Sequence, residues 1–542
     1  MVQTRSNVAP ALAARSARIA NLIRGAVASS RAGDRGKALE AGSTHESTGE
    51  ADEAGEFPDV GSQPLYVDLD GSLIASDSLW ESLCLLMRRH PSRIAALPFW
   101  AVRGRAVLKS RIAALVAPEA GLLPYRAEVM ALLGRERARG RPLVLATASH
   151  ERIARAVAAE VGLFDDVLAT TEGRNLKRGS KLEAIRDHSG GRPFAYLGDA
   201  RADLPIWSAA ECAYVVEPSP SLARAVARLG VPTEVVSDAQ TVGGRRAFLG
   251  ALRPHQWAKN GLLFAPIALA QQMGDTGRLG SVFWAFWAFC AVASAGYLFN
   301  DMLDIEADRR HPSKRHRPFA SGRLSIPLGQ VMIVALLTVG FGLALGWVSV
   351  AFTGMLGIYL MATLSYSLYL KERLLLDVLV LAGVYTHRIL SGGVAADIRV
   401  SPWLLVFSVF FFMSLALVKR YVEVRSGVDT KDASHSISRR AYQASDVGLI
   451  ETMGISSGYV SILVLGLWVN REGVSQYYSR PDALWLMLPL MLYWISRIWF
   501  RARRGELLDD PVLFALTDRV SYGIAVGIVL ITLVAALGGV GG

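Results

Sequence analysis

The sequence is poor in cysteine, and its three cysteines lie far apart. Cys84, Cys212 and Cys290 form no CxxC pair within the 542 residues. A disulfide framework or a cysteine zinc site needs more cysteines at closer, characteristic spacings, so the sequence supports neither. We expect the three side chains to be packing residues.

The first sixty residues lack the apolar segment of a secretory signal peptide. They are rich in Ala, Arg, Ser and Gly and then turn acidic in HESTGEADEAGEFPD. Such a composition can bury little apolar surface, which favours a disordered N-terminal segment over residues 1–60. The Arg-rich, acid-poor start also resembles an organelle transit peptide, and this alternative stays open.

Long charge-poor windows are nearly missing before residue 250 and frequent after it. Hydrophobic residues make up 52% of the chain, a high fraction for a soluble protein. We therefore predict a multidomain protein, with a soluble domain over residues 61–240 and a membrane domain over residues 241–542. The net charge of +11 comes from cations that crowd the ends of apolar segments. Lipid headgroups and loop topology account for such cations, so nucleic acid is not an expected partner.

In the predicted soluble domain, short apolar runs end in polar residues and alternate with helical stretches. LYVDLDGSL starts at residue 65, PLVLATAS covers residues 142–149 and FAYLGDARAD covers residues 194–203. This alternation is typical of a doubly wound, Rossmann-like α/β sheet, whose ligands bind beyond the carboxyl ends of the strands.

Four motifs with chemically useful side chains occur along this domain in a fixed order. They are DLDGS, the threonine of PLVLATAS, KRGSKLEAI and GDARAD, with the residues Asp68, Asp70, Thr147, Lys181, Asp199 and Asp203. In this set and order, the segment resembles the haloacid dehalogenase (HAD) superfamily of phosphatases. Ser72 stands where that family often has Thr.

The chemistry of these residues fits a phosphatase. A carboxylate can take a phosphoryl group, and a carboxylic acid two residues later can protonate the leaving alcohol and then activate water, while Mg²⁺ neutralises the crowded charge. The resemblance implies that Asp68 is the nucleophile, Asp70 the acid/base, and Thr147 and Lys181 the phosphoryl ligands. The implied metal ligands are Asp68, Asp70, Asp199 and Asp203. A helical, basic insertion at about residues 76–140 would form the cap that selects substrate in this family.

The membrane domain contains nine long apolar runs. They lie near residues 259–271, 281–299, 328–347, 350–370, 374–396, 402–418, 449–469, 483–499 and 520–538. Each run except the first approaches the length that spans the hydrocarbon core, so we predict an all-α domain of nine transmembrane helices.

The loops between these runs differ in positive charge. Starting from the soluble domain, the loops on one side hold 18 Lys or Arg residues and those on the other side hold 4. Because cytoplasmic loops carry the excess of Lys and Arg, we predict an inner-membrane protein with the soluble domain and the charged loops in the cytoplasm.

The segment NDMLDIEADRRHPSKRHRPFASG follows the second apolar run. Asn300, Asp304 and Asp308 recur at intervals of four, with Asp301 one step round, which predicts that all four line one face of a helix. Stacked carboxylates are costly without a cation, and Mg²⁺ bound to a diphosphate would offset the repulsion. The alternative for this segment is a solvated loop whose charges fix the topology.

His387 and Arg388 lie inside an apolar run, where an ionisable pair is functional by default. Simple packing inside the bundle remains possible for His387. NDxxDxxxD with its basic loop, together with Tyr366 and Lys371, resembles the UbiA superfamily of intramembrane prenyltransferases over nearly all of residues 250–542. That resemblance implies nine helices and Mg²⁺-dependent transfer from a diphosphate. Where ordinary members carry a second DxxxD motif, however, this sequence reads VKRYVE at residues 418–423.

RPHQWAKN, KRHRP, KRYVE and DDPVLFALTDR together resemble one branch of that superfamily, the decaprenyl-phosphate phosphoribosyltransferases. There the donor is phosphoribosyl pyrophosphate and the acceptor a polyprenyl monophosphate. The resemblance implies that Asp301, Asp304 and Asp308 hold Mg²⁺ and pyrophosphate. The candidate substrate-binding residues are Lys259, Asn260, Asn300, Lys314, Arg315, Arg317, Tyr366, Lys371, Arg388, Lys419, Arg420 and Glu423.

The fusion of the two domains supports one hypothesis about function. The membrane product would carry a ribose 5-phosphate ester, and the attached domain resembles enzymes that hydrolyse such esters. We therefore expect a bifunctional enzyme that makes polyprenyl-phosphoryl-ribose. Two alternatives stay open: an aromatic prenyltransferase fused to an unrelated phosphatase, and a non-catalytic HAD domain that acts as a sensor or scaffold.

Overall fold

The computed structural model describes residues 63–237, 244–428, 442–471, 474, 478–507, 511–515 and 517–537. The predicted disordered segment 1–60 lies outside the described residues. The chain divides into two compact units, of which the first combines Met1–Gly250 with Asp301–Gly329. The second unit combines Ala251–Asn300 with Gln330–Gly542.

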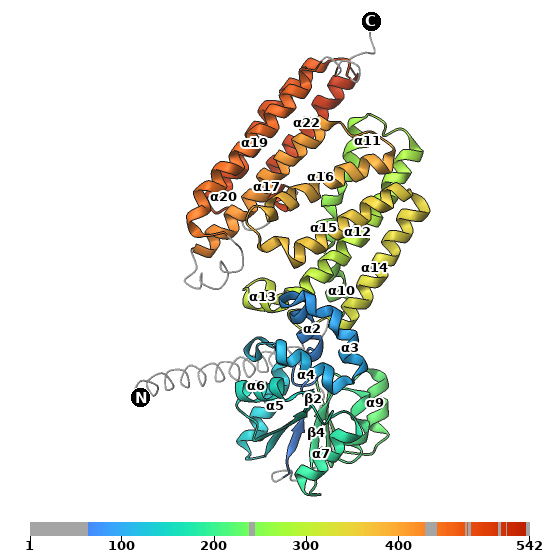
Figure 1. Cartoon of the computed structure of the whole chain (residues 1–542), viewed down its shortest axis with the longest axis vertical. Helices are drawn as coiled ribbons and strands as arrows, with labels where there is room; N and C mark the ends of the chain where they lie inside the picture. Colours follow the sequence, from blue (N-terminus) through green and yellow to red (C-terminus); the bar gives the residue numbers. More distant parts are fainter. Residues whose placement is uncertain are drawn as a thin grey trace, which may run out of the picture. The chain divides into compact units, whose positions relative to one another are not determined.

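A six-stranded parallel sheet forms the centre of the first unit, and it confirms the predicted Rossmann-like fold (Figure 1). The strand order is β3-β2-β1-β4-β5-β6. The strands are β1 Leu65–Val67, β2 Leu143–His150, β3 Asp166–Thr170, β4 Ala195–Gly198, β5 Cys212–Val216 and β6 Thr233–Val236. Because β1 pairs with both β2 and β4, the order reverses beside β1, and this is where a doubly wound sheet binds its ligands.

Helices cover both faces of this sheet. The side chains of β1 alternate, since Leu65 and Val67 join one apolar cluster and Tyr66 joins the other. The first cluster is completed by α5 Ala127–Ala138 and α6 Glu151–Val161, and the second by α7 Gly179–Ser189, α8 Leu204–Trp207 and α9 Pro220–Ala227. The buried sheet thus gives the loops after β1, β2 and β4 a rigid support.

A helical cap is inserted between β1 and β2. Its helices are α2 Ser78–Arg89, α3 Leu97–Val102 and α4 Arg105–Leu115. The Asp77 carboxylate caps α2 by accepting hydrogen bonds from the backbone N–H groups of Leu79 and Trp80. The cap has its own small apolar cluster around Leu86 and Ile112. Since α5 packs into the sheet cluster, this separate cap ends before α5, whereas the sequence predicted a cap to about residue 140.

The acidic segment after residue 300 differs from the predicted single helix. Helix α12 Thr276–Leu303 ends before Asp304, whose φ of −96° and ψ of 8° are not helical. A short helix, α13 Ile305–Arg310, and the turn η6 Lys314–His316 follow. The prediction that one continuous helical face carries all four residues is therefore wrong.

The membrane domain contains eight described helices that are long and apolar enough to cross a membrane, with mean hydropathies from 1.3 to 2.2. They are α12, α14 Ile326–Trp347, α15 Val350–Leu368, α16 Leu376–Ala396, α17 Pro402–Val428, α19 Val447–Val469, α20 Met487–Arg503 together with the 3₁₀ segment Pro481–Leu486 before it, and α22 Arg519–Leu537. The first predicted span, near residues 259–271, instead forms the 3₁₀ segment η5 Pro254–Phe264 and the short helix α11 Ala265–Leu269. The described residues thus give eight spans of that length rather than nine.

Candidate active sites

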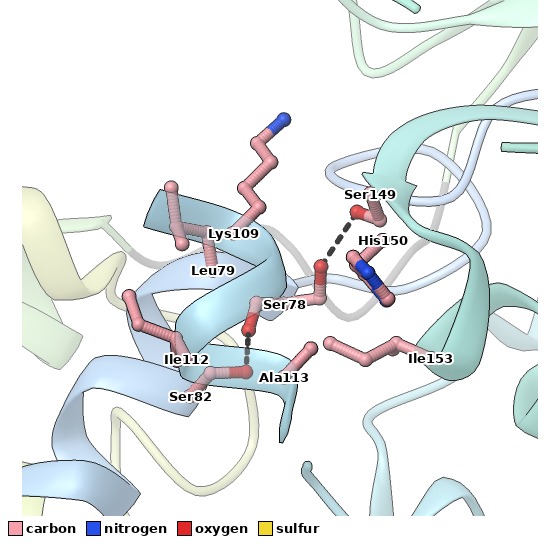
Figure 2. A pocket seen from close by; sticks show the side chains of 9 residues that line it. All are labelled: Ser78, Leu79, Ser82, Lys109, Ile112, Ala113, Ser149, His150 and Ile153. Atoms are coloured by element: carbon pink, nitrogen blue, oxygen red, sulfur yellow. Dashed lines mark hydrogen bonds between the residues drawn. The ribbon is translucent and has the colours of Figure 1, made fainter. Parts of the chain in front are cut away.

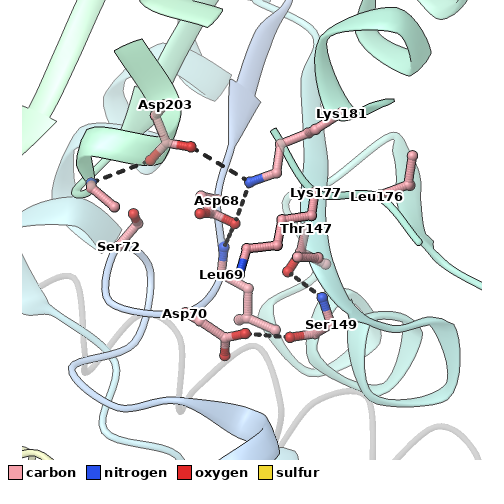
Figure 3. Close-up of polar contacts among 12 residues, drawn as sticks. Asp68, Leu69, Asp70, Ser72, Thr147, Ser149, Leu176, Lys177, Lys181 and Asp203 are labelled. Carbon is pink, nitrogen blue, oxygen red and sulfur yellow. Dashed lines mark hydrogen bonds and ion pairs between the residues drawn. The ribbon is translucent and has the colours of Figure 1, made fainter. Parts of the chain in front are cut away.

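The loop after β1 carries Asp68 and Asp70 (Figure 3). The backbone N–H of Asp68 donates to the Leu197 carbonyl at 2.9 Å, which ties the start of the loop to β4. Gly71 turns the chain with a φ of +80°, and a Cβ there would lie 2.2 Å from an Asp199 carboxylate oxygen. A side chain at position 71 would therefore displace Asp199, so the turn requires glycine.

Three carboxylates gather at this edge of the sheet. Ligand oxygens of Asp68, Asp199 and Asp203 all lie within 4.8 Å of one another. The Lys181 ammonium lies 3.0 Å from Asp68 and 3.8 Å from Asp203, and the Ser72 hydroxyl donates to Asp199 at 3.0 Å. We refer to Asp68, Asp199 and Asp203 as the carboxylate trio.

The electrostatics of the trio favour a bound cation. Burial, followed by repulsion from Asp68, raises the pKa of Asp199 to about 7 and that of Asp203 to about 6. The fold therefore concentrates negative charge that protons or a metal must neutralise. Mg²⁺ prefers oxygen ligands of this kind, so the trio fits the predicted metal site.

Asp70 lies next to the trio but points elsewhere (Figure 3). Its carboxylate accepts hydrogen bonds from the backbone N–H of Ser78 at 2.7 Å and from the hydroxyl of Ser149. Burial and the neighbouring Asp77 raise its pKa to about 7. This pKa suits the predicted acid/base role, because the group can hold or release a proton near neutral pH. The Asp70 carboxylate itself lies outside the trio, so it is not placed as a metal ligand.

Lys181 of α7 lies against the trio, whereas Thr147 lies within β2 rather than after it. Both are buried, and the Thr147 hydroxyl oxygen accepts a hydrogen bond from the backbone N–H of Ser149 at 3.0 Å. Ser78 and Ser149, which contact Asp70, were not among the predicted site residues. Ser149 follows Thr147 by two positions in ATAS, and Ser78 opens the first cap helix, so both offered a local signal.

A small cleft lies between the cap and the sheet domain, beside Ser78 and Ser149 (Figure 2). Ser78 from α2 and Ser149 from β2 are joined across it at 2.6 Å. The Lys109 ammonium of α4 donates to the Ala148 carbonyl at 2.5 Å, which also ties the cap to β2. The cleft is lined by Ser78, Leu79, Ser82, Lys109, Ile112, Ala113, Ser149, His150 and Ile153. The cap helices α2 and α4 thus line this cleft together with β2 and α6.

The aspartate segment, residues 301–310, belongs to the same compact unit. Asp301 and Asp308 are buried, and one Arg317 nitrogen lies 3.2 Å from Asp301 and 2.8 Å from Asp308. Burial raises the pKa of Asp308 to about 6 despite Arg317. Asp304 pairs with a different arginine, since its carboxylate lies 2.5 Å from the Arg88 guanidinium. Among the described residues, these three carboxylates therefore do not gather into one group as those of the trio do, since Arg317 holds Asp301 and Asp308 while Arg88 holds Asp304. Their oxygens are nevertheless of the kind that Mg²⁺ prefers.

The other predicted residues of this loop lie beside the aspartate segment. Lys314 and Arg315 form η6, directly before Arg317. Asn300, one residue before Asp301, falls in the second compact unit.

Within the second unit, Arg388 is the centre of a cluster with Lys259 and Asn260. The Arg388 guanidinium is buried and donates to the Asn260 side-chain oxygen at 2.9 Å and to the Tyr359 hydroxyl at 3.1 Å. It also lies over the ring of Tyr385, as does the Lys259 ammonium. In the part of the chain that the structure describes, no carboxylate pairs with Arg388. A buried cation among neutral partners can accept an anionic ligand.

Arg420, by contrast, has carboxylate partners. Its guanidinium lies 2.5 Å from Asp377, donates to the Tyr366 hydroxyl at 2.9 Å, and also pairs with Glu423. Asp377 in turn accepts a hydrogen bond from the Tyr442 hydroxyl at 2.7 Å. This network brings together Arg420, Tyr366 and Glu423, which were predicted to bind substrate. However, the charge of Arg420 is already balanced, so we do not expect it to bind a phosphate directly.

Two predicted cations remain in the second unit. Lys371 lies in the short turn η7 Leu370–Glu372 after α15, and Lys419 precedes Arg420 in α17.

Comparisons with known protein families match both halves of the chain. Residues 65–208 match the haloacid dehalogenase-like hydrolases, and residues 261–516 match the UbiA prenyltransferase family. The uncharacterized protein y4nM of Sinorhizobium fredii is 37% identical over 462 residues, covering 85% of this chain and 88% of that protein. The nodulation protein NoeC of Azorhizobium caulinodans is 37% identical, covering 52% of this chain and 92% of that protein. A decaprenyl-phosphate phosphoribosyltransferase of Mycolicibacterium smegmatis is 31% identical, covering 50% of this chain and 86% of that protein.

The raised pKa values in the trio predict that metal binding depends on pH. Both Asp199 and Asp203 bind protons more tightly in the folded protein than in the unfolded chain, so without metal the trio makes the fold less stable as the pH rises from about 4 to 7. Mg²⁺ must displace these protons at pH 5.5 but meets mostly ionised carboxylates at pH 7.5. Isothermal titration of the full chain with Mg²⁺ should therefore show affinity at least on the order of 10-fold higher at pH 7.5.

The matched control is Asp199→Asn, which removes one ligand and its titration. It should lose this pH-dependent binding while any binding at the aspartate segment persists. Equal Mg²⁺ affinity of the unsubstituted chain at the two pH values would contradict the assignment of the trio as a metal site.

Proposed function

Because the chain belongs to the UbiA prenyltransferase family and carries an N-terminal haloacid dehalogenase-like domain, we propose that it is a bifunctional membrane enzyme acting on a polyprenyl phosphate. The membrane domain transfers 5-phosphoribose from phosphoribosyl pyrophosphate to the lipid phosphate. The HAD domain then removes the 5-phosphate, which gives polyprenyl-phosphoryl-ribose. Both sites face the cytoplasm in this proposal, as the excess of positive charge in the loops on that side favours.

The transfer step exchanges one bond at the anomeric carbon of ribose. An oxygen of the lipid phosphate forms a bond to C1, and the bond between C1 and the pyrophosphate oxygen breaks with its electron pair. Asp301, Asp304 and Asp308 would hold Mg²⁺, which neutralises the charge that grows on the departing pyrophosphate. Arg317 lies between Asp301 and Asp308 and balances part of their charge, so Lys314 and Arg315 of η6 would meet the outer phosphate oxygens instead.

The lipid phosphate or the ribose phosphate needs a second anion site. The cluster of Arg388, Lys259 and Asn260 supports this role, because its guanidinium is buried among neutral groups. Tyr359 and Tyr385 would fix the orientation of the guanidinium, leaving its charge for the ligand. Arg420 would instead hold Tyr366 and Asp377 in place.

The hydrolysis step uses the carboxylates after β1. The Asp68 carboxylate attacks the phosphorus, the bond to the ribose 5-oxygen breaks, and Asp70 gives that oxygen its proton. Water then attacks the phosphoryl-aspartate while Asp70 takes up a proton, so inorganic phosphate leaves and both carboxyl groups are restored. Lys181 and Mg²⁺ at the trio would balance the charge of the phosphoryl group.

The main support for coupling the two steps is that both candidate sites occur in one chain. The trio, Lys181 and the proton-holding Asp70 are assembled in the same chain as a membrane domain related to decaprenyl-phosphate phosphoribosyltransferases. A HAD domain that served only as a scaffold would have no need for buried carboxylates crowded at this cost in charge repulsion. A phosphatase attached to a phosphoribosyltransferase has an obvious substrate in the 5-phosphate of the product.

Replacing the nucleophile should separate the two steps. With labelled phosphoribosyl pyrophosphate and polyprenyl phosphate, Asp68→Asn should accumulate the lipid that still carries the 5-phosphate, because dephosphorylation falls by about 10⁴-fold or more. Mass spectrometry of the extracted lipids measures the ratio of the two products. If Asp68→Asn and the unsubstituted protein give the same lipid products, the coupling is wrong.

Replacing an aspartate of the membrane site should have the opposite effect. Asp301→Asn should reduce formation of the phosphoribosyl lipid by on the order of 10² to 10³-fold, since one group that binds the charged leaving group is lost. Hydrolysis of a soluble phosphate ester by the same variant provides the folding control. If Asp301→Asn transfers phosphoribose normally, the segment does not bind the donor, and its charges only fix the topology. Transfer from a prenyl diphosphate to an aromatic acceptor, without use of phosphoribosyl pyrophosphate, would instead favour an aromatic prenyltransferase.

A further inference from the structure

The cap of the HAD domain and the aspartate segment are joined by ion pairs inside the first compact unit. The central pair is formed by Glu81 of α2 and Arg309 of α13. Two parallel hydrogen bonds of 2.8 and 2.7 Å connect them, and their side chains are only 3% and 6% exposed. A buried, bidentate pair of this kind fixes the relative orientation of the two helices.

Arg88, two turns further along α2, contacts the point where α12 ends. One guanidinium nitrogen donates to the Leu303 carbonyl at 3.2 Å and to the Asp304 carboxylate at 2.5 Å. The last carbonyls of a helix have no partner within the helix, and Arg88 supplies one. The same side chain therefore stabilises the helix end and holds the carboxylate that follows it.

Further contacts extend this interface on both sides. Arg89 pairs with Glu306 at 2.9 Å, and Glu119, which follows α4, pairs with Arg310. Gly322 lies so close to the start of the cap that a Cβ there would be 2.5 Å from the Ala75 carbonyl oxygen. The contacts thus run from Leu303 to Arg310 and are not limited to one pair.

We propose that Arg88, a residue of the phosphatase cap, is a positioning residue of the transferase site. This inference rests on the proposed function of Asp304 as a ligand of Mg²⁺. Asp304 lies at a non-helical position, so the helix does not fix the direction of its carboxylate. A carboxylate that binds a metal is commonly oriented by an outer hydrogen-bond donor, and Arg88 is that donor here. The cap therefore completes the metal site of the other enzyme domain.

The test compares three variants of the full chain, reconstituted in lipid: Arg88→Ala, Arg88→Lys and Arg103→Ala. Arg103 is the matched control, because it is another cap arginine whose guanidinium lies over the exposed ring of Phe99 at 4.2 Å. Loss of an outer-shell donor typically weakens metal affinity by about 10 to 100-fold. Arg88→Ala should therefore raise the Mg²⁺ concentration for half-maximal transfer by about that factor. Arg88→Lys should restore part of the loss, and Arg103→Ala should match the unsubstituted protein.

A second readout measures metal binding without catalysis. In an Asp68→Asn/Asp199→Asn background, which disables the trio, the remaining Mn²⁺ affinity is measured by electron paramagnetic resonance. Adding Arg88→Ala should weaken this binding by the same factor, and adding Arg103→Ala should leave it unchanged.

Each result decides between the proposals. If Arg88→Ala has an unchanged or lower metal requirement while the unsubstituted protein transfers phosphoribose, the positioning role is wrong and the proposed function stands. If the unsubstituted protein does not transfer phosphoribose, the proposed function is wrong. The Mn²⁺ measurement alone then decides the role of Arg88: weaker binding supports it, and unchanged binding overturns it.

Discussion

Buried carboxylates repel one another, and the structure keeps several of them in place by setting a cation beside them. Lys181 lies between Asp68 and Asp203, Arg317 lies between Asp301 and Asp308, and Arg420 lies against Asp377. The compensation at the trio is incomplete, because Asp199 and Asp203 still have raised pKa values. A group that remains under-compensated is ready for a ligand, whereas Asp377, which lies against Arg420 and Tyr442, serves as support.

The sequence predicted the architecture well where local patterns determine it. Apolar, β-branched runs located three of the six strands, and the lengths of the apolar runs located eight helices of membrane-spanning length. The break at Asp304 was not predictable, because the i, i+4 spacing favours a continuous helix and no Gly or Pro interrupts it. At this break, Arg88 from a distant part of the chain contacts the end of α12. The spacing of residues within the segment cannot predict a contact of that kind.

In the candidate sites, too, some residues could be placed from the sequence and others could not. Asp68, Asp199 and Asp203 could be placed together from motif order, because the carboxyl ends of parallel strands meet at one edge of the sheet. Arg420 could not be interpreted in this way, since its partner Asp377 lies 43 positions earlier on another helix. A cation read from sequence alone suits an anionic substrate, and only the structure shows that a carboxylate is already its partner.

The two ends of helix α2 contact the two candidate sites, so the length of this helix matters to both. Its first residue, Ser78, donates to Asp70, and its eleventh, Arg88, donates to Asp304. Inserting or deleting one residue in an α-helix rotates everything beyond it by about 100° and shifts it by about 1.5 Å. Such a change would remove Arg88 or Ser78 from its partner. Natural variation in chain length should therefore be excluded between these two residues, even though neither belongs to a catalytic motif.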